Sequence, residues 1–311
     1  MARALVRQGA DVRVLLRGSS NTQAIDDLLD CVEIVRGDLT DAASLRTAAA
    51  GCRQVYHVAA DYRFWSRDPE SMYKSNVGGT ENLLDAAADA GVERIVYTST
   101  VGCMGWPADG SPTNEDYPVS LDDMTGHYKR SKFLAERVAL DRAKKGVPVV
   151  IVNPTAPVGE RDVKPTPTGK TILDFLRGKM PAYIDTGLNV VDVHAVAEGH
   201  LLAAERGRIG ERYLLGDRNM ELREILETLA RITGRPAPKV RIPYAVAYAF
   251  AAVDTAIAGI TGKEPRAPLE AVKLARHKMF IDSDKARREL GYQSGNAEDA
   301  LARAVEWFRG R

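Results

Sequence analysis

Arg94-Ile95-Val96-Tyr97-Thr98-Ser99-Thr100 is a short apolar run that ends in Thr-Ser-Thr. Its β-branched and aromatic side chains predict a buried strand. Open α/β sheets bind their ligands beyond the carboxyl ends of the strands. We therefore expect this strand to carry hydroxyl groups to the edge of a ligand site.

Further apolar runs alternate with helix-like segments on both sides of this strand. Strand-like runs lie at 12–16, 32–35, 54–60 and 147–152, and helical patterns lie at 42–50 and 76–88. This alternation predicts an α/β fold with a doubly wound parallel sheet. After Asn153, four prolines and two glycines between 154 and 169 mark a long irregular loop, and most of the remaining chain is helical.

Composition and charge argue against several classes of protein. The net charge of +1 gives no reason to expect nucleic acid or an anionic membrane as the main partner. Cys31, Cys52 and Cys103 lack metal-ligand spacing and indicate buried thiols in a reducing compartment, so we expect a cytoplasmic protein without a metal site. The longest apolar stretch, 244–260, is expected to be a buried or substrate-facing helix and not a membrane span.

Tyr128 and Lys132 are four residues apart, so on a helix their side chains lie on one face. A tyrosine hydroxyl titrates near pH ~10, and a neighbouring ammonium favours the phenolate and lowers that pKa. Such a pair can exchange a proton with an alcohol or carbonyl while a cofactor moves the hydride. The spacing alone is a weak signal, since an exposed helix with a packed tyrosine and a solvated lysine also shows it.

The run 12–16 ends at Arg17, with Ser19 and Ser20 close behind. In a doubly wound nucleotide-binding fold, the end of the second strand meets the ribose of the adenosine half. An acidic residue there binds a free 2′-hydroxyl, whereas an arginine suits a 2′-phosphate. Arg17 therefore favours NADP over NAD, and a surface arginine after a strand is the plainer alternative.

Four motifs occur together in order: Asn76-Val-Gly-Gly-Thr80, Tyr97-Thr-Ser-Thr100, Tyr128-x-x-x-Lys132 and Asn153-Pro154. They resemble the extended short-chain dehydrogenases/reductases over nearly the whole chain. The resemblance implies a Rossmann-like sheet, hydride transfer with NADP or, less expected, NAD, and a possible homodimer through the helix that carries Tyr128.

The resemblance also implies roles for single residues. Thr100 would polarise the substrate oxygen, Tyr128 would pass the proton, and Lys132 would also hold the nicotinamide ribose. Asn76 would organise these groups. The expected cofactor contacts are Arg17, Asp38, Leu39, Val58, Ala59, Ala60, Ser99, Tyr128, Lys132 and Pro154. The expected substrate contacts are Asp61, Tyr62, Thr100, Asn153 and Thr155.

Two groups within this family resemble the chain most. Residues 153–162 and 164–169 resemble the hopanoid-associated sugar epimerases, so the favoured function is a sugar epimerase or dehydratase acting on a sugar nucleotide. Arg17 and the apolar stretch 244–260 favour an alternative, an NADPH-dependent ketoreductase of the dihydroflavonol-4-reductase type acting on a less polar ketone. A third alternative is a non-catalytic nucleotide-sensing protein.

One expected motif is missing from the sequence. Family members begin with a strand and a Gly-x-x-Gly-x-x-Gly turn whose backbone N–H groups meet the pyrophosphate. Here residues 2–8 read as the end of the helix that would follow that turn. We therefore expect a sheet without its first strand, two exposed strand edges, and weak or no cofactor binding.

The same resemblance divides the chain into two expected domains. A dinucleotide-binding domain would comprise 1–154 and 188–216. A smaller, mostly helical substrate-binding domain would comprise 155–187 and 217–311.

Overall fold

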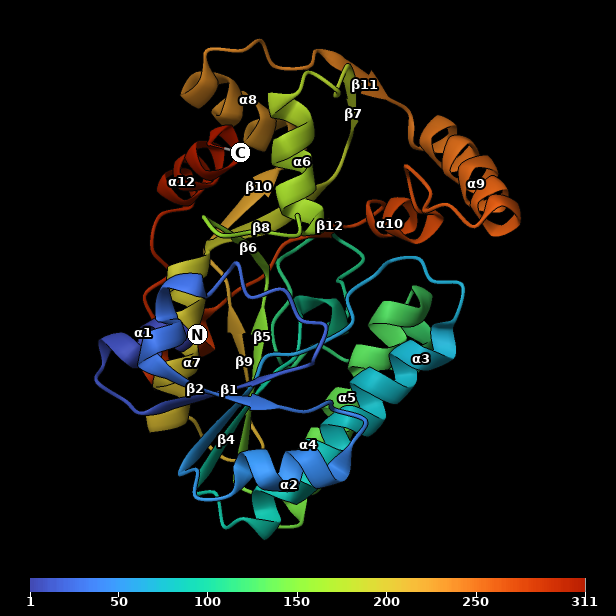
Figure 1. Cartoon of the computed structure of the whole chain (residues 1–311). Helices are drawn as coiled ribbons and strands as arrows, with labels where there is room; N and C mark the ends of the chain where they lie inside the picture. The colour runs from blue at the N-terminus through green and yellow to red at the C-terminus, as the bar shows by residue number, and fades with distance from the viewer. Residues whose placement is uncertain (311) are drawn as a thin grey trace.

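A computed structural model describes residues 1–310 and confirms the α/β fold with a parallel central sheet (Figure 1). The sheet has the strand order β3-β4-β5-β9, with every neighbouring pair parallel. Its strands are β3 (Gln54–His57), β4 (Arg94–Thr98), β5 (Val149–Pro154) and β9 (Arg212–Leu215). All six residues of β5 are buried, as expected for a central strand with helices on both faces.

Alternate residues of the central strands point to opposite faces of the sheet. Ile95 and Tyr97 pack under α4 (Gly79–Asp89) and α5 (Gly126–Lys144), together with the alanine faces of those helices. Val96 packs on the other face, against α7 (Val193–Arg206). The sheet therefore fixes where α5 lies, and α5 carries Tyr128 and Lys132.

The N-terminal strands form a separate parallel pair, as the absent first strand predicts. β1 (Val12–Leu16) pairs only with β2 (Val32–Arg36) in residues 1–310, and β3 pairs only with β4. Leu15 of β1 and Val55 of β3 nevertheless pack on one apolar cluster beneath α2 (Ala42–Ala49) and α4. Within residues 1–310, no strand joins β1 to β3, and every residue of β1 is only half-buried.

A second group of elements lies above the central sheet in Figure 1. A sheet of order β10-β8-β12, with β6 also paired to β8, packs under three helices. These elements are β6 (Ala156–Val158), β8 (Gly187–Asp192), β10 (Arg218–Glu221), β12 (Lys278–Met279), α6 (Pro167–Leu176), α8 (Leu222–Thr233) and α12 (Ala297–Arg309). The segment 188–216 contributes to both groups, since β8 joins this sheet and β9 joins the central one. The proposed domain boundaries remain a prediction.

Shorter elements complete the described chain. They are α1 (Ala2–Arg7), η1 (Asp26–Cys31), α3 (Pro69–Tyr73), η2 (Lys74–Gly78), η3 (Val101–Cys103), η4 (Leu121–Asp123), β7 (Ala182–Ile184), β11 (Val240–Ile242), α9 (Tyr244–Thr261), α10 (Leu269–Leu274) and α11 (Asp284–Leu290).

Two expectations of burial were wrong. The apolar stretch forms α9, but only Ala251 and Ala258 of this helix are buried, and the alternative of a substrate-facing helix stays a prediction. Among the described residues, α9 is the one helix whose length and composition would suit a membrane span. Cys31 is exposed, whereas Cys103 is buried and Cys52 is intermediate.

Candidate active site

Tyr128 lies in the first turn of α5, close to the carboxyl end of β4. Its side chain lies beside that of Thr100. The ring of Phe64, from the loop after β3, meets the Tyr128 ring edge-on with centroids 5.8 Å apart. The structure therefore brings together the two residues that the sequence assigns to the substrate oxygen.

Lys132 lies one turn further along α5 and is buried. Its Nζ donates to the Tyr97 hydroxyl and to the carbonyl of Thr98, both at 2.8 Å. Burial lowers the pKa of Lys132 to about 8, and burial raises the pKa of Tyr128 to about 12. The lowered tyrosine pKa that the spacing suggested is wrong for this structure, because desolvation dominates and the ammonium is directed at Tyr97 and Thr98.

Asn76 occupies a single π-helical turn, η2, and is buried. Its Oδ1 accepts from the N–H of Asp61 at 2.7 Å, and its Nδ2 donates to the Asp61 carbonyl and to the Ser131 hydroxyl. Ser131 in turn donates to the carbonyl of Tyr128 at 2.8 Å. Asn76 therefore ties the loop after β3 to the turn that presents Tyr128, and π-turns of this kind are frequent at functional sites.

Thr100 is held by a second buried network. The side-chain amide of Asn153 donates to the Thr100 carbonyl at 3.1 Å and to Glu136 at 2.7 Å. Glu136 also pairs with Arg212 of β9 at 3.2 Å. Asn153 is fully buried, so its amide positions Thr100 in this structure, while its expected contact with substrate stays a prediction.

The other expected residues near Thr100 occupy different positions. Ser99 is buried and donates to the Cys103 sulfur at 3.4 Å. Thr155 follows β5 and donates to Asn189 at 2.9 Å, and Pro154 is the buried last residue of that strand. Tyr62 is exposed, and its hydroxyl donates to the carbonyl of Lys164 at 3.5 Å.

The expected cofactor contacts nearest the gap in the sheet are more open. Val58 and Ala59 are exposed where β3 ends, and Ala60 is half-buried. Asp38 accepts from the backbone and hydroxyl of Thr40, and hydrogen bonds from Thr40 lower the pKa of its carboxyl group. Leu39 lies against Gly79, where a Cβ atom would come within 2.6 Å of the leucine Cβ.

Arg17 lies at the exposed end of β1. Its backbone N–H donates to Ser20 and its carbonyl accepts from Arg36, which fixes the turn. Among residues 1–310, no side chain forms an ion pair with its guanidinium. A 2′-phosphate could therefore be met without breaking an existing pair.

A dinucleotide fits this chain at its two ends better than at its centre. The expected contact of Lys132 with the nicotinamide ribose and that of Arg17 with the adenosine ribose stay predictions. The backbone cradle for the pyrophosphate has no counterpart in the described residues, because the strand between β1 and β3 is lacking. Weak cofactor binding by this chain stays a prediction.

Two residues of the site were missed in the sequence. Ser131 links Asn76 to Tyr128, and its place inside the Tyr-x-x-x-Lys motif was a usable signal. Lys129 is buried beside Gly102, and its Nζ lies 5.7 Å from the centre of the Trp106 ring. Nothing in its local sequence shows that this lysine is buried.

Two polar groups outside the Tyr128 cluster have structural roles. His57 is buried and its Nε2 lies 3.0 Å from the Thr80 hydroxyl, so it belongs to the core. Asp192 caps α7 by accepting from the N–H of His194 and pairs with Arg303. Neither group faces Tyr128 in the contacts described.

Comparison with known proteins agrees with this geometry. Residues 1–216 match the NAD dependent epimerase/dehydratase family. The chain is 44% identical to a "putative dihydroflavonol 4-reductase" of Synechocystis sp., over 99% of this chain and 90% of the relative. It is 35% identical to "sterol demethylase protein B" of Methylococcus capsulatus, over 100% and 94% respectively.

A solved structure described as a nucleoside-diphosphate-sugar epimerase from Pseudomonas aeruginosa is also similar. It superposes with a TM-score of 0.81 at 32% identity, over 99% of this chain and 92% of that one. The matched family and the similar proteins are NAD(P)-dependent reductases, epimerases and dehydratases. This chain belongs to the NAD-dependent epimerase/dehydratase family of extended short-chain dehydrogenases/reductases.

Proposed function

We propose that this protein is an NADP-dependent oxidoreductase that reduces the carbonyl group of a largely apolar small molecule. The placement of the Tyr128 side chain beside Thr100, at the carboxyl end of β4, carries this proposal. Thr100 would donate a hydrogen bond to the substrate oxygen, and Tyr128 would donate the proton that the oxygen gains. When bound, the nicotinamide would supply the hydride.

Tyr128 is protonated at neutral pH, which is the state that a proton donor needs. Burial raises its pKa to about 12, so the proton is present, and a bound substrate or cofactor would have to favour its release. Lys132 would hold the nicotinamide ribose through the same ammonium that now meets Tyr97 and Thr98. Asn76 would hold the backbone of Tyr128 in place through the hydrogen bonds of Ser131.

Aromatic side chains around the tyrosine support an apolar substrate. Phe64 packs edge-on against Tyr128, and Trp106 lies near Lys129 on the Thr100 side. The names of the Synechocystis and Methylococcus relatives refer to a dihydroflavonol and a sterol, ring systems far less polar than a sugar nucleotide. Of the two candidate functions, the ketoreductase is therefore the better supported.

A sugar epimerase or dehydratase remains the second candidate. Residues 154–169 favour it, because Lys164 of this segment contacts Tyr62, an expected substrate contact. The similarity to the Pseudomonas structure also favours it. This segment carries Arg161, a residue with a positive φ of 66° whose guanidinium pairs with Asp27. The hopanoid-associated group, possible homodimerisation and a cytoplasmic location remain predictions of the same kind.

Net oxidation of reduced nicotinamide separates the two candidates. We expect NADPH absorbance to fall when the protein is given an apolar aryl or alicyclic ketone. Interconversion of a sugar nucleotide without a net change in NADPH would instead establish the epimerase. Absence of turnover with both substrate classes, in protein shown to bind NADPH, would contradict both.

A further inference from the structure

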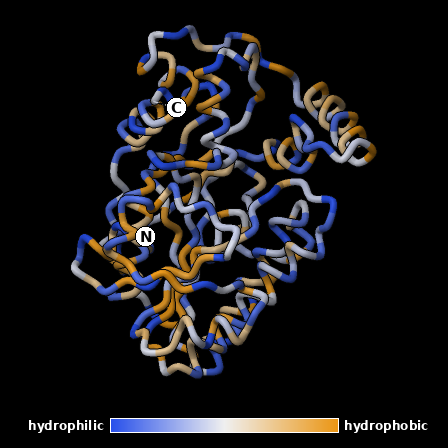
Figure 2. Tube along the Cα trace, viewed as in Figure 1, coloured by the Kyte–Doolittle hydropathy of each residue, from blue (hydrophilic) through white to orange (hydrophobic). Residues whose placement is uncertain are grey.

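Helix α9 presents a continuous apolar stripe to solvent. Val246, Phe250, Val253, Ile257 and Ile260 are spaced by four and three residues in turn, which places them on one face of the helix. Their exposed fractions run from 52% to 85%. Figure 2 shows this helix at the outer edge of the molecule, coloured mostly hydrophobic. Scattered exposed apolar residues are ordinary, but a contiguous apolar face marks an interaction site.

The opposite face of α9 is already used by the fold. Ala251 and Ala258 are buried, and α9 packs against α10. Asp254, the one charged residue of the helix, accepts from the N–H of Ala267 at 2.9 Å, and Thr255 accepts from the N–H of Leu269. The stripe itself therefore carries no charge.

Both ends of α9 return to the same body. The preceding strand β11 pairs with β7, and α10 follows directly and packs back on the helix. A helix held in this way can lie on a surface but cannot cross a bilayer without unfolding one of these attachments. It has the geometry of an interfacial helix.

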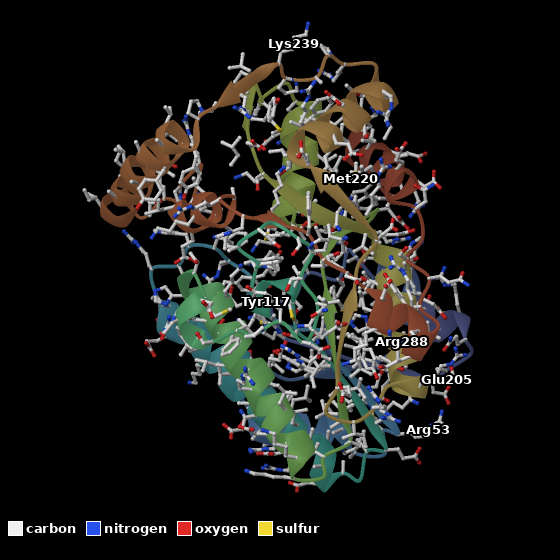
Figure 3. The ribbon with its side chains drawn as sticks, turned by 180° about the vertical axis from the view of Figure 1, so that it is seen from behind. Arg53, Tyr117, Glu205, Met220, Lys239 and Arg288 are labelled. Atoms are coloured by element: carbon white, nitrogen blue, oxygen red, sulfur yellow. The ribbon has the colours of Figure 1, made fainter. Side chains whose placement is uncertain are left out.

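Basic residues flank the stripe at both ends. Residues 235–266 contain five basic and two acidic side chains, a net charge of +3, whereas the whole chain carries +1. Lys239 precedes the helix, as does Arg241, which pairs with Asp185 at 3.1 Å, and Lys263 and Arg266 follow the helix. Figure 3 shows Lys239 pointing away from the body at the extreme end of the molecule. Tyr244 and Tyr248 lie at one end of the helix, where interfacial aromatic residues are common.

We propose that α9 docks the protein on the surface of an anionic lipid bilayer. The stripe enters the boundary between headgroups and acyl chains, and the flanking lysine and arginine side chains meet the lipid phosphates. A second copy of the chain fits less well, because pairing two α9 helices would bring two segments of net charge +3 together. The bilayer instead complements both the apolar stripe and the charge.

Sedimentation with vesicles tests this proposal. The full chain is mixed with phosphatidylcholine vesicles containing increasing fractions of phosphatidylglycerol. We expect the bound fraction to rise with phosphatidylglycerol and to fall with added salt. The double variant Val253→Glu/Ile257→Glu should bind at least about tenfold more weakly, since each glutamate places a charge on the inserted face.

Two variants control for unrelated effects. Ile209→Glu adds the same charge at an apolar residue of similar exposure, 51%, outside α9, and should bind as the unaltered chain does. Lys263→Gln/Arg266→Gln should weaken binding to anionic vesicles about tenfold and leave binding to neutral detergent micelles unchanged. Circular dichroism melting curves establish that each variant is folded.

Two results would overturn the proposal. One is an unaltered chain that stays in the supernatant at every lipid composition. The other is a concentration-dependent dimer, seen by analytical ultracentrifugation, that Val253→Glu/Ile257→Glu dissociates while vesicle binding is absent. The second result would assign the stripe to another copy of the chain.

Discussion

The basic side chains at the two ends of the expected cofactor site differ in burial. In the catalytic half, Lys129 and Lys132 are buried, and burial lowers the pKa of each to about 8. In the adenosine half, Arg17 is exposed and no described side chain forms an ion pair with it. Catalytic groups that stabilise developing charge are most effective when they are preorganised in a site that excludes water. A group that only recognises a phosphate can stay in water until the ligand arrives.

The strands beneath these two halves show the same difference. The catalytic half rests on β5, all of whose residues are buried, and on networks that join Asn76, Ser131 and Tyr128. The adenosine half rests on β1, which is half-buried throughout and has one strand partner. The groups around Tyr128 therefore rest on a buried strand and Arg17 on a half-buried one.

Tyr128→Phe should give the largest effect on the catalytic half. It removes the hydroxyl that would protonate the substrate and leaves the ring against Phe64. We expect turnover to fall by about 10²–10⁴-fold with cofactor affinity nearly unchanged. The measurement is NADPH oxidation at saturating ketone, with binding followed by calorimetry.

Tyr56→Phe is the matched control for this change. The Tyr56 hydroxyl contacts the exposed Gln54 side chain at 2.9 Å, away from α5. Its removal should leave turnover unchanged. Full activity in Tyr128→Phe would show that another group supplies the proton.

Lys129→Met should change stability by the next largest amount. An unfolded lysine titrates near pH ~10.4, whereas burial lowers the pKa of Lys129 to about 8 in the folded protein. Between these values the unfolded chain keeps a proton that the folded protein has lost, so the free energy of unfolding rises with pH from about 8 to 10. The methionine removes this slope at position 129 and should raise the free energy of unfolding at pH 7 by on the order of 1–3 kcal/mol.

Urea unfolding at pH 7 and pH 10 measures this effect. Lys132 should keep its own share of the pH dependence, because burial lowers the pKa of that lysine in the same direction. Lys144→Met, at a side chain that is 78% exposed, should change neither value. A less stable Lys129→Met protein at pH 7 would show that the ammonium has a favourable partner in the fold.

The same contrast explains what the sequence could predict. The buried catalytic half follows from local patterns: apolar runs predicted β4 and β5, and the four-residue spacing placed Tyr128 and Lys132 on one helix face. The direction of the tyrosine pKa shift did not follow, because it depends on how completely the fold desolvates the hydroxyl. Nor did the exposure of α9, since an apolar helix reads alike whether the surrounding fold covers it or leaves it open.

Arg17→Ala should give the smallest of these effects and tests the adenosine half. Removing an exposed guanidinium that meets a 2′-phosphate should weaken NADP binding about tenfold and leave NAD binding unchanged. Calorimetric titration of both dinucleotides measures the difference. Arg53→Ala, at an exposed arginine before β3, serves as the control and should alter neither affinity.

The same titrations on a chain lengthened by a strand and a glycine-rich turn sharpen the comparison. One outcome is that the lengthened chain binds NADP much more tightly, with a preference over NAD that Arg17→Ala removes. The adenosine half of the 311-residue chain would then lack only the contacts to the pyrophosphate. If the chain of 311 residues binds NADP equally well, other backbone groups must meet the pyrophosphate. The gap between β1 and β3 would then be compatible with a complete cofactor site, and the contrast between the two halves would be one of exposure alone.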